Sequence, residues 1–343
     1  MNRWVARIWG ETCVASRLLA PIAAVWGAVA GTRMRRPPSH RANVPVIAVG
    51  NFTVGGAGKT PTVAHLADLL RADGRRPAVV TRGYGGRARG PVAVDPARHR
   101  SVDVGDEALL HARTTLTIVS ADRPAGAREA ERLGADCILL DDGFQNPRLA
   151  KDLSVVVVDR ASGLGNGRVM PAGPLRAPLE AQLERTHALV VIDSGEGTHV
   201  STERLLDRAK ALGLPIFGAR IVPNPADRLG GRRVIGFAGI GRPAKFAATL
   251  TTAGGLLVDF VAFPDHHPFT EAEAKDLLQR AVSADADLVT TAKDAVRLAG
   301  GSGALARLAK TVRVLEAGLV FDEPARLAAL VEAVVGRGAQ PRP

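Results

Sequence analysis

Short apolar runs alternate with helical periodicity through the middle of this chain. Apolar runs typical of buried strands occur at 46–50, 78–81, 136–142, 154–159 and 188–193. Between them lie segments in which apolar side chains recur every three to four positions, the spacing of a helix that packs one face on a sheet. Strands that alternate with helices in this way predict a doubly wound, mostly parallel α/β sheet.

A second, smaller α/β unit is predicted to follow the Pro-Asn-Pro turn at 223–225. Its first strand is expected at 234–239. The Gly-Ile-Gly turn at 239–241 invites a dinucleotide-binding interpretation, but so short a pattern is weak evidence, and a tight strand-to-helix turn explains it. We expect residues 311–321 to return to the first sheet as a strand. The predicted domains are 43–222, 223–311, and a return strand with a C-terminal helix over 312–343.

The N-terminal arm, residues 1–42, combines an apolar run with an excess of arginine. The run from Leu18 to Gly31 has 14 residues; as a helix it would span roughly 21 Å, less than the ~30 Å hydrocarbon core of a membrane. We therefore expect a helix that lies on a membrane without crossing it. The side chains suited to the headgroup level are Trp4, Ile8, Trp9 and Trp26. The arm has one acid, Glu11, against seven basic residues that an anionic leaflet would attract: Arg3, Arg7, Arg17, Arg33, Arg35, Arg36 and Arg41.

Two alternatives exist for this arm. The Ala-Val-Ala sequence at 28–30 has the small-x-small form of a signal-peptide cleavage site. Arginines at 33, 35 and 36 follow the run at once, which hinders export and is typical of a cytoplasmic side. The second alternative is a core helix with a solvated basic face.

Composition limits the class of partner. The chain has 343 residues, a formal net charge of +11 and only 4% aromatic residues. A basic protein meets something acidic, such as nucleic acid, an anionic membrane or a phosphorylated substrate. We expect no nucleic-acid partner, because stacking aromatics are scarce and zinc-finger spacing is absent from the sequence. The two cysteines, Cys13 and Cys137, form no C-x-x-C pair, which fits a reducing cytoplasm. No protein partner is predicted.

A phosphate-binding loop follows the first predicted strand. Strand 46–50, a glycine-rich loop and an apolar-periodic helix from Pro61 to about Asp73 come in the order of a P-loop. Backbone N–H groups of such a loop surround phosphate oxygens, Lys59 would reach the β- and γ-phosphates, and the Thr60 hydroxyl would ligate magnesium. The usual first glycine is replaced by Thr53, and the motif does not distinguish ATP from GTP. The predicted nucleotide-binding residues are Thr53, Val54, Gly55, Gly56, Ala57, Gly58, Lys59 and Thr60.

A pair of carboxylates ends the predicted strand at 136–142. Asp141 and Asp142 follow the apolar run Cys-Ile-Leu-Leu, the form of a Walker B element. Carboxylates at the C-terminal end of a parallel strand beside a P-loop are placed to hold Mg²⁺, directly or through water. A solvated turn is the alternative for Asp142.

These strings, taken together, closely resemble the tetraacyldisaccharide 4′-kinase family, the lipid A 4′-kinases. The matching strings occur in one order between residues 50 and about 297. They are G-N-F-T-V-G-G-A-G-K-T-P from Gly50, T-R-G-Y-G-G from Thr81, V-G-D-E from Val104, L-L-D-D-G-F-Q-N from Leu139, G-P-L-R-A-P from Gly173, F-P-D-H-H-P-F-T from Phe263 and T-A-K-D-A-V from Thr291.

The resemblance implies ATP and Mg²⁺ as cofactors and an acylated disaccharide 1-phosphate lipid as acceptor. The expected reaction transfers the γ-phosphate to the 4′-hydroxyl of that lipid, on the cytoplasmic face of the inner membrane of a Gram-negative bacterium. Three positions depart from the family pattern: Asn146 stands where histidine is frequent, Ala108 where proline is frequent and Ala292 where glutamate is frequent. These departures concern local substrate contacts more than the reaction.

The resemblance also implies the catalytic residues. Asp106 is the candidate base for the acceptor hydroxyl, and His266 is its expected partner, which orients it or tunes its pKa. From the residues alone, Asp106 could equally be a helix N-cap, since Gly-Asp-Glu precedes an apolar-periodic segment. Asp106 and His266 fall in different predicted domains, so we expect their pairing to depend on closure of a cleft. With Lys59 they complete the predicted catalytic group.

Five further side chains are candidates for binding the acceptor or its phosphate. Arg82 and Tyr84 lie in a flexible turn after the strand at 78–81, and Arg123 and Arg176 carry guanidinium groups suited to phosphate. Gln145, in the L-L-D-D-G-F-Q-N string, is the fifth. For the arginines, an ordinary surface ion pair is the alternative.

A different class remains open from the P-loop alone: a GTPase or ATPase switch, or a metallochaperone. Switch proteins of that type carry lysine early in the loop, where this chain has Val54. A metallochaperone would need cysteine or histidine clusters, which the sequence lacks. A membrane-recruited scaffold that only senses nucleotide is the third possibility.

Overall fold

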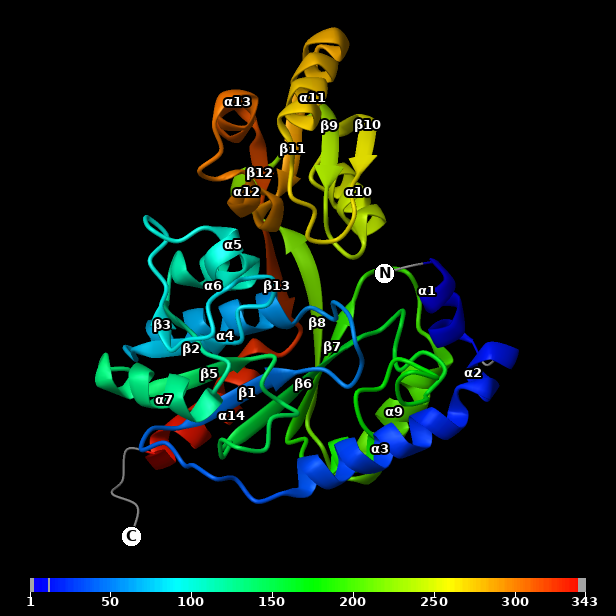
Figure 1. Cartoon of the computed structure of the whole chain (residues 1–343), viewed down its shortest axis with the longest axis vertical. Coiled ribbons are helices and arrows are strands. Elements are labelled where there is room, and N and C mark those ends of the chain that lie inside the picture. The colour runs from blue at the N-terminus through cyan, green and yellow to red at the C-terminus, as the bar shows by residue number, and fades with distance from the viewer. Residues whose placement is uncertain (1–2, 12, 339–343) are drawn as a thin grey trace.

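The larger part of the molecule is a nine-stranded, mostly parallel sheet (Figure 1). The computed structural model describes residues 3–11 and 13–338. The strand order is β13-β8-β7-β6-β1-β5-β2-β4-β3, and β3 and β13 run antiparallel to their neighbours. The mixed α/β fold with a mostly parallel sheet that the sequence predicts is therefore confirmed. The strands are β1 (Val46–Gly50), β2 (Pro77–Thr81), β3 (Val92–Ala93), β4 (Leu116–Val119), β5 (Cys137–Asp141), β6 (Leu153–Asp159), β7 (Ala188–Asp193), β8 (Ile216–Pro223) and β13 (Ala317–Phe321).

Helices cover both faces of this sheet because its strands are apolar on both sides. Ile47 and Val49 of β1 pack in one cluster with side chains of α4 (Lys59–Ala72) and α14 (Pro324–Gly338). Ala48, which points to the other face, packs with α7 (Arg123–Arg132). Farther along that face lie α3 (Ala20–Arg35), α8 (Leu179–Leu183) and α9 (Val200–Ala211). The short helices α5 (Ser101–Val104) and α6 (Asp106–Ala112) precede β4.

The smaller part is a four-stranded parallel sheet with the order β10-β9-β11-β12, drawn above the large sheet in Figure 1. Its elements are β9 (Arg233–Ala238), α10 (Pro243–Thr252), β10 (Leu256–Ala262), α11 (Glu271–Ala284), β11 (Asp287–Thr291), α12 (Ala292–Leu298), α13 (Gly303–Thr311) and β12 (Arg313–Leu315). The expected return strand over 311–321 is divided: β12 pairs with β11 in this sheet, and only β13 joins the large one. Glu316 lies between the two strands and belongs to neither, and Thr311 is still part of α13, so one continuous strand over 311–321 is ruled out.

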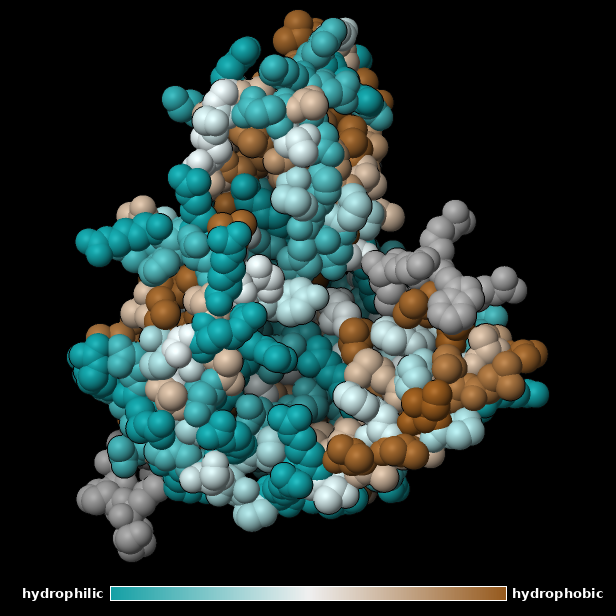
Figure 2. Space-filling model, in the orientation of Figure 1, coloured by the Kyte–Doolittle hydropathy of each residue, from teal (hydrophilic) through white to brown (hydrophobic). Residues whose placement is uncertain are grey.

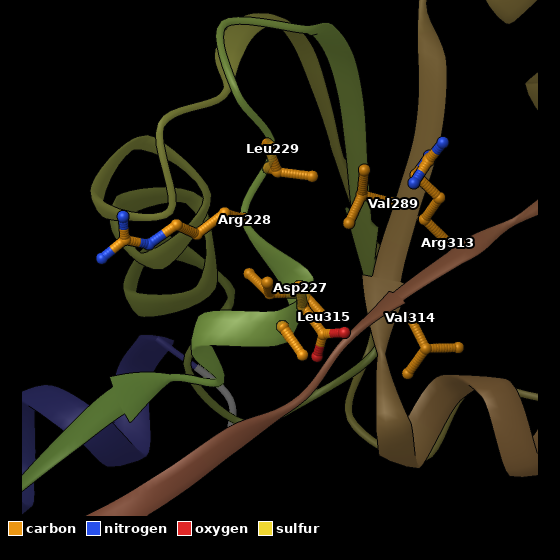
Figure 3. A pocket seen from close by; sticks show the side chains of 8 residues that line it. Asp227, Arg228, Leu229, Val289, Arg313, Val314 and Leu315 are labelled. Carbon is orange, nitrogen blue, oxygen red and sulfur yellow. The ribbon is translucent and has the colours of Figure 1, made fainter.

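The two segments that connect the sheets lie side by side. One passes through the short helix η1 (Pro225–Asp227), and the other is the β12–β13 junction (Figure 3). Asn224 N–H donates to the Glu316 carbonyl at 2.8 Å, and Glu316 N–H donates to Asp227 at 3.1 Å. A cavity of about 80 Å³ between Leu229, Val289 and Leu315 borders this junction. The chain therefore passes between the two sheets twice at the same place.

The N-terminal arm consists of α1 (Arg3–Gly10), α2 (Val14–Leu18) and α3. The side of α3 that packs on the protein carries the small residues Ala23, Gly27 and Gly31. A Cβ added at Gly27 or at Gly31 would lie 3.6 Å from the Pro178 side chain, so the helix packs closely there. Its opposite side exposes Ile22, Val25, Trp26 and Val29, and Figure 2 shows apolar side chains gathered over this helix. The Trp4 side chain lies outside the described residues. Within the described ranges, no helix is long and apolar enough to cross a membrane.

Candidate active site

The phosphate loop lies at the C-terminal edge of the large sheet, between β1 and α4. Gly58 is the N-cap of α4 with φ of 94°, a conformation that favours glycine, and a Cβ there would lie 2.2 Å from Ile192. Val54 N–H donates to the Pro174 carbonyl at 2.8 Å and so ties the loop to a neighbouring segment. The N-terminus of the 14-residue helix α4 adds partial positive charge where phosphate would bind. Thr60 is the second residue of that helix.

Lys59, Asp142 and Arg176 meet beside this loop. The Lys59 ammonium lies 3.7 Å from an Asp142 oxygen and donates to the Asn51 side chain at 3.2 Å. Burial lowers the pKa of Lys59, and the nearby Asp142 charge partly opposes that shift. Arg176 donates to the same Asp142 oxygen at 2.9 Å and to the Thr53 carbonyl at 3.0 Å. The structure therefore brings the predicted phosphate loop together with Asp142 and Arg176, two other residues predicted for the site.

Asp141, the other acid of the pair, is buried at the end of β5. His111 Nε2 lies 3.2 Å from its Oδ2. Burial by itself would raise the pKa of Asp141, but the hydrogen bond with His111 and the charges of His111, Lys59 and Lys293 outweigh it and lower the pKa. Asp141 is thus held as a carboxylate behind the phosphate loop.

Asp106 lies in a contact that joins the two sheets. It is the first residue of α6, and its carboxylate makes no capping bond to that helix, because Gly105 is the N-cap. Oδ2 instead accepts from His266 Nδ1 at 2.9 Å and from Arg297 Nε at 2.7 Å, and Oδ1 accepts from the Ser101 hydroxyl. The N-cap interpretation of Asp106 is therefore wrong. The expected contact with His266 is present.

The hydrogen bonds to Asp106 keep it ionised. Only 3% of Asp106 is exposed, and burial by itself would raise its pKa. Hydrogen bonds from His266 and Ser101 and the charge of Arg297 reverse that effect and lower the pKa from 3.8 to about 2. The Asp106 hydrogen bond in turn raises the pKa of His266.

A second ion pair, Glu107–Lys293, lies next to Asp106. Lys293 donates to Glu107 Oε1 at 2.6 Å, while Oε2 is buried without a partner in the described structure. The Lys293 charge also contributes to lowering the pKa of Lys59. One ligand atom each from Asp106, Glu107 and His266 lies within 4.8 Å of the others, a spacing that could hold a cation. Asp106, Glu107, His266, Lys293 and Arg297 thus form one charged cluster between α6 and the small sheet.

The remaining predicted substrate contacts occupy different surroundings. The Tyr84 ring is 71% exposed and lies edge-on to His266 with centroids 5.3 Å apart. Arg82 is exposed in the same turn. Arg123 is buried and donates to the Ser120 and Asp141 carbonyls, at 2.7 Å and 3.3 Å, so it supports the end of β5 and does not point into solvent. Gln145 donates to the Asn51 carbonyl at 2.7 Å and supports the start of the loop.

A second contact between the two sheets involves the end of β6. Asp159, which is buried, accepts from Lys245 of α10 at 2.7 Å and lies 3.0 Å from the Arg242 guanidinium. The small sheet is thus connected to the large one by ion pairs at Asp106, Glu107 and Asp159.

Sequence reasoning missed four residues of this site: Glu107, His111, Lys293 and Arg297. Glu107 and Lys293 stand inside the strings V-G-D-E and T-A-K-D-A-V, so the motifs carried a signal for both. His111 lies four residues after Glu107 on α6, and Arg297 lies four residues after Lys293 on α12, which is one helical turn in each case. Helical spacing from each motif could have indicated them.

The fold and the site define a class of protein. The protein has a P-loop at the edge of a doubly wound sheet and two carboxylates at the end of the neighbouring strand. It also has a buried carboxylate, Asp106, in contact with the part that contains the second sheet. These features are those of a P-loop phosphotransferase. A family model described as tetraacyldisaccharide-1-P 4′-kinase (LpxK) matches residues 15–335. The chain belongs to this family.

Individual relatives agree with that assignment. The tetraacyldisaccharide 4′-kinase of Methylobacterium radiotolerans is 50% identical over 333 residues, 97% of this chain and 98% of the relative. That of Nitrobacter hamburgensis is 50% identical over 324 residues, 94% of this chain and 95% of the relative. Among solved structures, LpxK from Aquifex aeolicus in complex with ATP matches with a TM-score of 0.70 at 26% identity, covering 94% of this chain and 100% of that one.

Proposed function

We infer that this chain transfers the γ-phosphate of ATP to the 4′-hydroxyl of a tetraacyldisaccharide 1-phosphate, a step of lipid A biosynthesis. Family membership supports the reaction and does not favour a GTPase switch or a metallochaperone. The observation that carries the mechanism is the buried Asp106 carboxylate, which accepts from His266 and Arg297 and is followed by Glu107, the partner of Lys293.

The nucleotide part of the mechanism uses the loop from Thr53 to Thr60. Its backbone N–H groups and the α4 N-terminus hold the phosphates, and Lys59 stabilises the charge that moves onto the β–γ oxygen. Arg176, which already contacts Asp142 and Thr53, lies where it can neutralise the transferred phosphoryl group. Lys59 and Arg176 are thus the two cations that stabilise the transition state.

Mg²⁺ fits the donor set of this site. Thr60, Asp141 and Asp142 offer oxygen atoms, the ligands that Mg²⁺ prefers, and the unpartnered Glu107 Oε2 is a further acceptor nearby. When bound, the ion would neutralise charge on the β- and γ-phosphate oxygens. The lowered pKa of Asp141 keeps that side chain in the ionised form that a cation requires.

Asp106 is the proposed base. As the 4′-oxygen bonds to the γ-phosphorus, the bond from that phosphorus to the β–γ bridging oxygen breaks, and ADP leaves with its electron pair. The hydroxyl proton passes to Asp106. A carboxylate with a pKa of about 2 is a weak base, so in this mechanism most of the rate comes from positioning and charge stabilisation and less from proton transfer. His266 orients Asp106, and Tyr84 and Arg82 flank the approach of the acceptor.

Closure of the two sheets would couple acceptor binding to transfer. Asp106 belongs to the part of the chain that contains the large sheet, while His266 and Arg297 belong to the part that contains the small sheet. Any movement that separates the two parts would therefore break both hydrogen bonds. The paired connections at Asn224 and Glu316 are the natural hinge for that motion. Equal ATP hydrolysis rates with and without acceptor lipid would count against this coupling.

The exposed apolar side of α3 supports the proposal that the protein associates with a membrane. Val25, Trp26 and Val29 are 68%, 50% and 63% exposed, and arginines lie at the C-terminal end of the same helix. An apolar face with basic residues beside it is suited to lying in the headgroup region of an anionic membrane. We place the protein on the cytoplasmic face of the inner membrane, where both ATP and the acceptor lipid are available.

The testing experiment supplies detergent-dispersed tetraacyldisaccharide 1-phosphate, Mg²⁺ and γ-labelled ATP to the wild type and to Asp106→Ala. We expect label in the lipid with the wild type and a loss of at least about 100-fold in the variant. Label with little loss would keep the kinase and remove Asp106 as base. Folded wild-type protein that hydrolyses ATP without labelling lipid would favour the nucleotide switch.

A further inference from the structure

A basic cavity lies at the C-terminal end of α3, outside the phosphate loop. Its volume is about 290 Å³. Four cationic side chains line it: Arg36, Arg41, Lys151 and Arg185. Among the described residues of the lining, Glu184 is the one carboxylate, and it is already held by Arg35 through two hydrogen bonds of 3.0 Å and 2.8 Å. Arg41 is paired with Asp152, outside the lining, at 3.1 Å. Arg36, Lys151 and Arg185 therefore give the cavity its surplus of positive charge.

Lys151 differs from the other cations of the lining because it is largely buried and its pKa is lowered. Its ammonium donates to the backbone carbonyl of Asn146 and, in the described part of the chain, is paired with no carboxylate. Burial and the nearby charge of Arg185 lower the pKa of Lys151 to about 8. A cation that is enclosed with another cation and without a counter-ion is costly, and an anion entering the cavity would remove that cost.

Hydrogen bonds join the last turn of α3 to the segment after α8 at the edge of the cavity. The Arg35–Glu184 pair attaches the last turn of α3 to the end of α8, and Arg185 donates to the Arg35 carbonyl at 3.2 Å. That bond satisfies one of the free carbonyls of the helix end, which would otherwise repel an anion. The exposed apolar side of α3 begins about two turns before Arg35, at Val29, and continues to Trp26.

We propose that this cavity binds the phosphate group of an anionic membrane phospholipid while the acyl chains lie along the apolar side of α3. Arginine and lysine are the side chains that bind phosphate best, because both remain charged and donate several hydrogen bonds. The volume admits one headgroup and excludes a complete lipid. The site would orient the arm on the bilayer. This proposal rests on the membrane association proposed above.

The test compares binding to vesicles for the wild type, Lys151→Ala and Arg33→Ala. Arg33 is exposed on the last turn of α3 and lies outside the lining, so it reports the general attraction of one charge to an anionic surface. Vesicles contain phosphatidylcholine alone or with phosphatidylglycerol, at constant ionic strength. We expect Arg33→Ala to weaken binding to anionic vesicles about fivefold and Lys151→Ala to weaken it by at least about 20-fold, since a buried site is screened less by salt.

Further measurements distinguish a discrete headgroup site from general charge attraction, acceptor binding and free-phosphate binding. Kinase turnover in neutral detergent should be unchanged in Lys151→Ala, which shows that the variant is folded and tests the proposed reaction separately. Equal losses in the two variants would overturn the discrete site. A raised KM for the acceptor in neutral detergent, with no change in vesicle binding, would overturn it in favour of the acceptor's own 1-phosphate. Complete competition by inorganic phosphate at low millimolar concentration would overturn it in favour of a free-phosphate site.

Discussion

Arg297 on α12 donates to Asp106 on α6 at 2.7 Å although 191 residues separate them. Both side chains are only 4% exposed, so this ion pair is among the most buried contacts between the two sheets. Arg297 also donates to the Gly239 carbonyl and to Asp294, both at 2.7 Å. The guanidinium thus holds the proposed base in place from the opposite sheet.

Removal of Arg297 should affect both stability and turnover. We expect Arg297→Ala to lower the free energy of unfolding by about 3 kcal/mol, because a buried carboxylate loses its cationic partner. Urea denaturation measures this, and turnover should fall in parallel as Asp106 loses its orientation. Arg280→Ala, which removes two exposed ion pairs, is the control and should cost less than about 1 kcal/mol. A loss of that small size in Arg297→Ala would contradict the structural role.

His266 should make stability depend on pH. Its hydrogen bond with Asp106 raises the pKa of His266 above 6.5, so the folded chain binds this proton more tightly than the unfolded chain. The resulting stabilisation is fully present below pH 6.5 and disappears as the pH rises through the raised pKa. His266→Gln should therefore be less stable than the wild type at about pH 6, with the gap in unfolding midpoint narrowing by about pH 9. A gap independent of pH would refute the pairing in solution.

Lys59→Ala should abolish transfer without unfolding the protein. Burial disfavours the charged form of Lys59 and lowers its pKa, so this side chain adds little to stability. We therefore expect its removal to leave the free energy of unfolding within about 1 kcal/mol of the wild type. Loss of its charge at the transferring phosphate should reduce turnover at least about 100-fold. Lys210→Ala, on an exposed part of α9, should be active. Near-normal turnover in Lys59→Ala would mean that the loop is wrongly assigned.

Alanine substitution at Gly56 and at Gly58 of the loop should have different effects on stability and on ATP affinity. Gly58 has φ of 94°, and its Cβ would lie 2.2 Å from Ile192, whereas a Cβ on Gly56 would meet nothing within 4 Å. We expect Gly58→Ala to lose about 1–3 kcal/mol from backbone strain alone and to lose ATP affinity, and Gly56→Ala to stay near the wild-type stability. Calorimetric titration with ATP and urea denaturation measure both quantities. Equal effects would show that the loop adapts to a side chain at either position.

The sequence by itself determined the local parts of this protein. Val46–Gly50 is apolar throughout, and Lys59–Ala72 repeats with a helical period, so strand, loop and helix follow from short-range physics. The same holds for the run that ends at Asp141, because a carboxylate after a buried strand lies at the sheet edge. The motif strings added the pairing of Asp106 with His266, which no local pattern contains.

Only the tertiary structure decided which side chains share a site. Arg297 and Lys293 reach Asp106 and Glu107 across the two sheets, and their contacts depend on how α12 packs against α6. Arg123 resembles a substrate ligand in sequence, yet it is buried against the Asp141 carbonyl. Local propensity is set by neighbours within a few residues, while burial, ion pairing and pKa depend on atoms brought together from distant parts of the chain. For that reason the elements could be predicted and the charge network could not.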